Sequence, residues 1–229
     1  MRIGGLQKIS LIDFPGKISC IVFVQGCNLR CPFCHNPELV LPERFTTPLD
    51  VEETISFLER RKKYLEGVVI TGGEPCCDAG LQVFLKRVKG MGYLVKLDTN
   101  GTFPAVIRKA IEENAVDYIA MDVKGPPGKY KVLAGAPVNI RDVEKSISLI
   151  KDSGLGYEFR TTVVRELLEV KDFEEIGRLV AGAGIFYLQR FVPSKAVDPA
   201  SLTFRTYSDE EFEASRKIML KYVRECQVR

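Results

Sequence analysis

Residues Val24 to Asn36 read VQGCNLRCPFCHN. It places Cys27, Cys31 and Cys34 close together with the spacing C-x₃-C-x₂-C. Three cysteines are one ligand short of a tetrahedral zinc site and of a four-cysteine iron–sulfur site. The stretch therefore raises the question of which fourth ligand completes the site.

Composition limits the class of protein. The chain has 229 residues, 45% of them hydrophobic and 28% charged, which predicts a single globular domain over residues 1–229. A net charge of +3 from 33 basic and 30 acidic residues does not favour nucleic acid as a partner. We expect no membrane span and no signal peptide, and hence a cytoplasmic protein. Its seven cysteines should be reduced there, so a tight cysteine cluster indicates metal binding or catalysis.

Short β-rich runs alternate with amphipathic patterns along most of the chain. The predicted strands are 19–25, 67–71, 94–98, 118–122, 157–164 and 186–191, and the predicted helices are 50–64, 81–91, 104–113, 141–152, 172–181 and 209–223. Asp50, Asp172 and Asp209 mark expected helix starts. Strands separated by helices pair in parallel through right-handed crossovers. Six such units predict an α/β fold, a partial (β/α)₆ TIM-like open barrel.

Polar residues follow the predicted strands at their carboxyl ends. After the first four strands come the cysteine motif, GGEP at 72–75, DTNG at 98–101 and DVKG at 122–125. The fifth strand carries Glu158 and Arg160, and the sixth carries Gln189 and Arg190. In parallel α/β folds the reactive residues gather at this edge of the sheet. The sequence therefore predicts one site built from these loops.

The cysteine motif admits three interpretations. A structural zinc site would use the three cysteines with His35, although the adjacent Cys34 and His35 are poorly placed to bind one ion. Inert buried thiols do not suit a loop rich in Gly, Pro and Asn. In a [4Fe–4S] cube, three thiolates hold three irons and leave the fourth iron open to a small molecule. We favour the third interpretation.

The motif, with Phe33 before its last cysteine, resembles the signature of the radical S-adenosylmethionine (SAM) superfamily. The resemblance implies that the amino and carboxylate groups of SAM bind the open iron. It also implies that one electron from the cluster cleaves SAM into methionine and a 5′-deoxyadenosyl radical.

The resemblance assigns roles to further residues. Gly72, Gly73 and Glu74 match the family's GGE turn, which receives the methionyl ammonium, and Phe33 is counted among the cofactor contacts. It implies that Asp98 or Asn100 binds the ribose of SAM. It further implies that Asp122 and Lys124 contact SAM, and that Arg160 pairs with the SAM carboxylate. In some members a monovalent cation lies beside SAM, which would place one at Asp98 and Asp122.

The segments SLIDFPG, CPFCHNPE, DTNG and DVKG resemble glycyl-radical-enzyme activating enzymes, most of all the activating protein of anaerobic ribonucleoside-triphosphate reductase. The resemblance implies that the radical takes a hydrogen atom from a glycine Cα of a partner enzyme. The implied partners are this glycyl radical enzyme and an electron donor such as flavodoxin or ferredoxin. Activation of a pyruvate formate-lyase-type enzyme, a small-molecule reaction such as 7-carboxy-7-deazaguanine formation, and a non-catalytic electron carrier remain alternatives.

The other four cysteines are interpreted as ordinary thiols. Cys20 lies in a predicted strand and is expected in the core. Cys76 and Cys77 follow GGEP, and with Cys226 they could ligate a second cluster. Adjacent cysteines make awkward ligands of one cluster, so buried or half-buried thiols are the preferred interpretation.

Overall fold

The computed structural model describes all residues, Met1–Arg229. The chain packs into two compact units. The first unit consists of Met1–Asn28, Glu38–Thr99 and Ala105–Ile119, and the second of Leu29–Pro37, Asn100–Pro104 and Ala120–Arg229. The predicted single domain stays a prediction.

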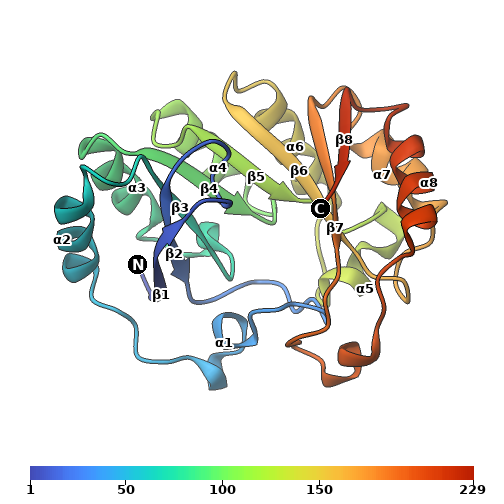
Figure 1. Cartoon of the computed structure of the whole chain (residues 1–229), viewed down its shortest axis with the longest axis horizontal. Coiled ribbons are helices and arrows are strands. Elements are labelled where there is room, and N and C mark those ends of the chain that lie inside the picture. Colours follow the sequence, from blue (N-terminus) through green and yellow to red (C-terminus); the bar gives the residue numbers. More distant parts are fainter. The chain divides into compact units, whose positions relative to one another are not determined.

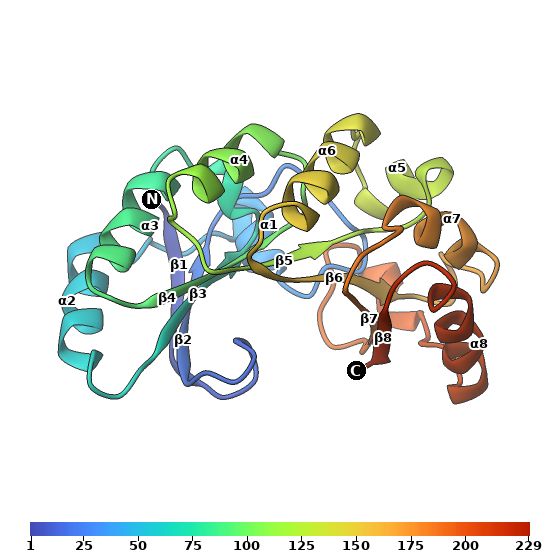
Figure 2. The same cartoon turned by 90° about the horizontal axis from the view of Figure 1, so that it is seen from above.

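The first unit is built on four strands in chain order, β1 (Ile3–Ser10), β2 (Ser19–Val24), β3 (Gly67–Gly72) and β4 (Leu94–Thr99). β1 pairs antiparallel with β2, whereas β2–β3 and β3–β4 are parallel. The helices of this unit are α1 (Pro37–Val40), α2 (Val51–Arg61), α3 (Leu81–Gly90) and α4 (Pro104–Glu112), the first and last starting one residue outside it. Figures 1 and 2 show α2 and α3 beside these strands.

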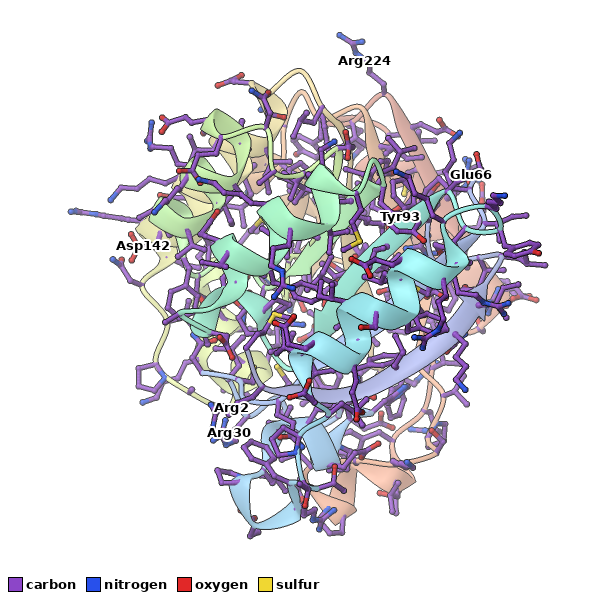
Figure 3. The ribbon with its side chains drawn as sticks, turned by 90° about the vertical axis from the view of Figure 1, so that its left-hand side faces the viewer. Arg2, Arg30, Glu66, Tyr93, Asp142 and Arg224 are labelled. Atoms are coloured by element: carbon purple, nitrogen blue, oxygen red, sulfur yellow. The ribbon has the colours of Figure 1, made fainter.

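The core of the first unit lies between its strands and its helices. Val22, Val68 and Ile70 are fully buried, and Leu58 of α2 is buried with them. Tyr93, labelled in Figure 3, lies just before β4. Its hydroxyl donates a hydrogen bond to the Leu58 carbonyl at 2.8 Å. This bond ties the end of α2 to the start of β4.

The second unit contains three parallel strands, β6 (Gly156–Val163), β7 (Ile185–Arg190) and β8 (Glu225–Val228). Strand β5 (Tyr118–Asp122) begins in the first unit and ends in the second. The helices are α5 (Tyr130–Ala134), α6 (Ile140–Lys151), α7 (Asp172–Leu179) and α8 (Asp209–Met219). Helices α7 and α8 pack together, and α8 contacts β7 and β8 (Figure 2).

Four short 3₁₀ helices complete the structure. They are η1 (Pro42–Arg44), η2 (Pro75–Cys77), η3 (Pro127–Lys129) and η4 (Pro199–Thr203). None of the helices in the chain combines the length and the apolar character that a bilayer-spanning helix requires.

The six predicted strands are all present as β2 to β7, but two outer strands were missed. β1 contains two adjacent glycines, and three of its residues are exposed, so its periodicity is weak. β8 has four residues, and Glu225 and Gln227 are exposed. Neither has the buried apolar run that marks the inner strands.

The predicted helix starts are correct within one residue. The Asp50 side chain accepts a hydrogen bond from the Glu53 N–H and caps α2 as expected. Helix α8 is capped by Ser208 in a capping box with Glu211, so Asp209 is its first residue instead of its cap. Asp172 likewise lies inside the first turn of α7, where its carboxylate accepts the Glu169 N–H.

Candidate active site

The cysteine motif is divided between the two units. Cys27 follows β2 in the first unit, while Cys31 and Cys34 lie in the second. In neither unit do three Cys, His, Asp or Glu side chains gather as a metal-ion site. The ligand set of Cys27, Cys31 and Cys34 therefore stays a prediction, and each part is described within its own unit.

The second-unit part of the motif is held by backbone hydrogen bonds. The Cys34 N–H donates to the Cys31 carbonyl at 3.0 Å, which closes a tight turn. The Arg30 N–H donates to the Ala134 carbonyl at 2.8 Å, at the end of α5. The Asp198 N–H donates to the Pro32 carbonyl at 3.0 Å. Two distant segments thus fix the turn that carries Cys31 and Cys34.

Gly135 makes the contact with α5 possible. It ends α5 in the left-handed conformation, with φ of 62°. A Cβ atom at this position would lie 1.9 Å from the carbonyl oxygen of Arg30. Only glycine allows the end of α5 to approach the cysteine turn this closely.

The Gly135→Ala variant should therefore be strongly destabilised. We expect the free energy of unfolding to fall by about 3 kcal/mol, because left-handed strain and a backbone clash act together. Gly128→Ala is the matched control, since a Cβ there meets no atom within 4 Å. Chemical denaturation of both variants measures the difference, and equal stabilities would contradict the contact.

The rings of Phe33 and His35 pack against Phe191. The ring centres of Phe33 and Phe191 are 6.4 Å apart in an edge-on contact, and those of His35 and Phe191 are 5.5 Å apart. Phe33 is 5% exposed, so it is a core residue of the second unit, and its contact with a cofactor stays a prediction. Burial lowers the pKa of His35, which favours the neutral ring.

Lys124 supplies positive charge to the cysteine turn. Burial raises the pKa of Cys31, and the Lys124 ammonium opposes this effect. Burial alone would lower the pKa of Lys124, but Asp122 and then Cys31 and Cys34 hold it above its usual range. A fixed cation favours thiolates, which are the metal-binding form of cysteine. The chemistry of these donors therefore fits an iron–sulfur cluster.

Asp122 and Lys124, at the end of β5, form one charged group with Arg160 in the middle of β6. The Lys124 ammonium donates to one oxygen of Asp122 at 3.0 Å, and the Arg160 Nε donates to the other at 2.7 Å. Burial would raise the pKa of Asp122, but the two cations outweigh it and hold the pKa below its usual range. The structure thus brings together the three residues that the sequence predicted on these strands.

Two neighbours of this group had no predicted role in binding the cofactors. Glu158, 1% exposed, lies 3.5 Å from Arg160 and 2.7 Å from Arg229. The Tyr130 hydroxyl accepts the Lys124 N–H at 3.3 Å, and burial raises the pKa of Tyr130 to about 12. Glu158 had a sequence signal, as a carboxylate two residues before Arg160 in a strand, whereas Tyr130 had none.

In the first unit, the GGE turn presses against the chain that leaves β2. A Cβ on Gly72, whose φ is 122°, would lie 2.4 Å from the Val24 nitrogen. A Cβ on Gly73 would lie 2.1 Å from the Gly26 carbonyl oxygen. Both glycines are therefore needed to pack this turn next to the residue that precedes Cys27.

The Glu74 carboxylate faces into the first unit. Glu74 is 1% exposed, and its Oε1 accepts the Cys76 N–H at 3.0 Å and the Thr99 hydroxyl at 2.8 Å. Thr99 directly follows Asp98 in β4. The structure thus brings the GGE turn and the end of β4 together, as predicted, and adds Thr99 as the link between them.

Asp98 lies near the end of β4 and Asn100 directly follows that strand, but their surroundings differ. Asp98 accepts a hydrogen bond from the ammonium of Lys96 at 2.7 Å. Asn100 belongs to the second unit, where its Oδ1 accepts the N–H and the hydroxyl of Thr102. Asn100 therefore forms a local turn, and a ribose contact by either residue stays a prediction.

The remaining cysteines are mostly buried. Cys20, Cys76 and Cys226 are buried, as expected for ordinary thiols, and burial raises their pKa values, that of Cys20 to about 12. Cys77 is exposed, not half-buried, because η2 turns its side chain outward.

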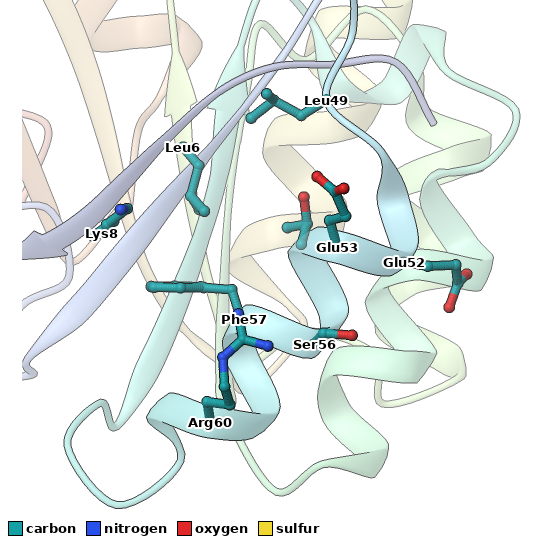
Figure 4. A pocket seen from close by; sticks show the side chains of 9 residues that line it. Leu6, Lys8, Leu49, Glu52, Glu53, Ser56, Phe57 and Arg60 are labelled. Atoms are coloured by element: carbon teal, nitrogen blue, oxygen red, sulfur yellow. The ribbon is translucent and has the colours of Figure 1, made fainter.

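A surface hollow of about 630 Å³ lies elsewhere in the first unit, between β1 and α2 (Figure 4). Leu6 and Phe57 provide apolar surface, and Lys8, Glu53 and Arg60 provide charges. None of the predicted site residues lines it. The hollow is therefore separate from the candidate site.

Comparisons with known proteins show the family of this chain. The profile of the Radical SAM superfamily matches residues 21–180. A protein of Methanocaldococcus jannaschii named "Putative glycyl-radical enzyme activating enzyme" is 33% identical over 96% of this chain and 92% of its own length. The pyruvate formate-lyase-activating enzyme of Clostridium pasteurianum is 28% identical over 75% of this chain and 72% of its own length.

A solved structure gives the same fold. Streptococcus suis SuiB bound to S-adenosylmethionine superposes with a TM-score of 0.67 and 13% identity, over 91% of this chain and 51% of that one. This chain thus spans about half the length of SuiB. The α/β fold with parallel strands, predicted as a partial (β/α)₆ open barrel, is confirmed. The chain belongs to the radical SAM superfamily, whose enzymes use a [4Fe–4S] cluster and SAM.

Proposed function

We propose that this protein is an activating enzyme that places a glycyl radical on a partner enzyme. The observation that carries the proposal is the likeness to the M. jannaschii protein, which extends over 96% of this chain. The likeness to a pyruvate formate-lyase-activating enzyme supports the same class of reaction.

In this proposal the motif Cys27, Cys31 and Cys34 holds the cluster, and the Lys124 ammonium opposes the rise that burial causes in the pKa of Cys31. When bound, the cluster and SAM supply a 5′-deoxyadenosyl radical. The protein's part is to bind, orient and shield SAM.

Three charged side chains would bind the amino and carboxylate groups of SAM. The buried Glu74 suits the methionyl ammonium, and Lys124 and Arg160 suit the carboxylate, because charge-assisted hydrogen bonds are strong in a water-poor site. Asp98 or Asn100 would contact the ribose. Asp122 holds Lys124 and Arg160 in place by accepting from both.

We propose anaerobic ribonucleoside-triphosphate reductase as the partner, with flavodoxin or ferredoxin as the electron donor in the cytoplasm. The segments SLIDFPG, CPFCHNPE, DTNG and DVKG support this choice. An enzyme of the pyruvate formate-lyase type is the second candidate partner, since an activating enzyme for it is among the relatives.

Electron paramagnetic resonance tests the proposal. The reconstituted protein, SAM and reduced flavodoxin are incubated anaerobically with each candidate partner, and 5′-deoxyadenosine is measured in parallel. We expect a glycyl-radical doublet on the reductase, and none on a reductase variant whose radical-bearing glycine is alanine.

The two readouts separate the possible failures. Deoxyadenosine formation with no doublet on either partner would overturn the activating function while leaving SAM cleavage intact. A doublet on pyruvate formate-lyase alone would keep the class of reaction and replace the partner.

A further inference from the structure

Lys96 is a buried lysine that the proposed chemistry does not use. It lies in β4 and is 2% exposed. Because side chains two apart in a strand share a face, Lys96 and Asp98 point to the same side of β4. The Lys96 ammonium lies 2.7 Å from Asp98 Oδ1.

Apolar and aromatic residues lie beside Lys96. Lys96 pairs in register with Val69 of β3, which belongs to a buried cluster with Phe14 and Ile21. The ammonium lies 5.9 Å from the ring centre of Tyr118, which packs against the same cluster. A charged lysine is retained in such a place only if an anion compensates it, and Asp98 does so.

The two acids implied for a monovalent cation are therefore already neutralised, each within its own unit. Asp98 is paired with Lys96, and Asp122 is paired with Lys124 and Arg160. A metal cation bound to Asp98 would lie close to a fixed ammonium, and like charges at such short range repel strongly. The residues present do not fit a bound monovalent cation.

We propose that the ammonium of Lys96 takes the place of a monovalent cation at Asp98. Lys96 is then a positioning residue that fixes the Asp98 carboxylate for SAM, and SAM binding does not depend on potassium or sodium ions. The inference rests on the proposed assignment of Asp98 to the SAM site. It predicts a cation requirement that appears only when Lys96 is removed.

The test compares the wild type with Lys96→Met in about 0.1 M potassium chloride and in N-methylglucamine chloride of equal ionic strength. SAM affinity of the reconstituted protein is measured by anaerobic calorimetry. We expect the wild-type Kd to be the same in both salts. For Lys96→Met we expect a Kd at least about tenfold weaker in N-methylglucamine, with recovery in potassium.

Two further variants separate positioning from folding. Lys89→Met removes a lysine paired with Asp117 at 2.6 Å in the same unit, and it should show no salt response in SAM binding. Lys96→Met with Asp98→Asn removes both charges of the pair. This double variant should fold and bind SAM weakly, with no response to potassium.

The thermal unfolding midpoint of the cluster-free protein gives a second readout that needs no SAM. Potassium should raise the midpoint of Lys96→Met relative to N-methylglucamine, and leave the wild-type midpoint unchanged. A potassium-dependent wild type, or a Lys96→Met variant without a potassium response in either readout, would overturn the inference. A wild type that binds no SAM in either salt would overturn the proposed function, and the midpoints would still decide the role of Lys96.

Discussion

Replacing Cys27, Cys31 or Cys34 by alanine is expected to abolish the iron–sulfur cluster. In the proposed site the three thiolates are the protein's only ligands, so a variant keeps two, which is too few to hold a cube. Reconstituted wild type should contain about four irons per chain, and each variant a small fraction of that. Iron and sulfide analysis, the visible absorbance of the cluster and 5′-deoxyadenosine formation measure the effect.

Cys77→Ser is the matched control for these variants. Cys77 is exposed and lies outside the motif, so its variant should keep full iron content and SAM cleavage. Far-UV circular dichroism of the cluster-free proteins checks that each variant folds. A Cys31→Ala protein with a full iron content would contradict the assignment, and zinc in place of iron in the wild type would restore the zinc interpretation.

Asp122→Asn should have the second largest effect, on both stability and SAM binding. The asparagine leaves Lys124 and Arg160 without the carboxylate that both contact. The Asp122 side chain is 31% exposed, so removing its charge from this partly buried group should cost about 2 kcal/mol of unfolding free energy, between the values for exposed and buried pairs. Because the two cations are also the proposed partners of the SAM carboxylate, we expect SAM affinity to fall at least about tenfold.

The stability lost in Asp122→Asn should depend on pH in a defined direction. The folded-state pKa of Asp122 is held below its usual range, so its contribution to stability is complete above the unfolded-state pKa of about 4. The contribution is lost as the pH falls from there through the folded-state pKa. The stability difference between wild type and Asp122→Asn should therefore be largest near neutral pH and shrink in acid.

Denaturant titration at several pH values measures this difference. Asp142→Asn is the control, because Asp142 forms a surface pair with Lys145 at 3.4 Å, and such pairs contribute less than about 1 kcal/mol. Equal losses in Asp122→Asn and Asp142→Asn, or a difference that does not change with pH, would contradict the role given to Asp122.

The strand–helix alternation could be predicted from the sequence because its signals are local. Each inner strand is a short apolar run, and the side chains that begin several helices, such as Asp50, lie next to the residues they cap. The GGE turn and the ends of β4 and β5 could be located because they directly follow such runs. Pattern and position along the chain are sufficient for both.

The contacts that hold the candidate site in place could not be predicted in the same way, because they join residues far apart in the sequence. Gly135 contacts Arg30, and Arg229 reaches Glu158. Lys96 was missed for a different reason. Its signal, a lysine two residues before Asp98, is visible in LVKLD, but only burial shows that the pair matters.

The exposure of Cys77 has a practical consequence. Because the thiols of the motif are occupied in the proposed holoenzyme and Cys20, Cys76 and Cys226 are buried, Cys77 is the thiol that a maleimide reagent reaches first. It lies three positions after Glu74, on the short helix that follows the GGE turn. If the proposed site is correct, a nitroxide or fluorophore attached there should report arrival of the nucleoside cofactor without any change to the proposed cluster ligands.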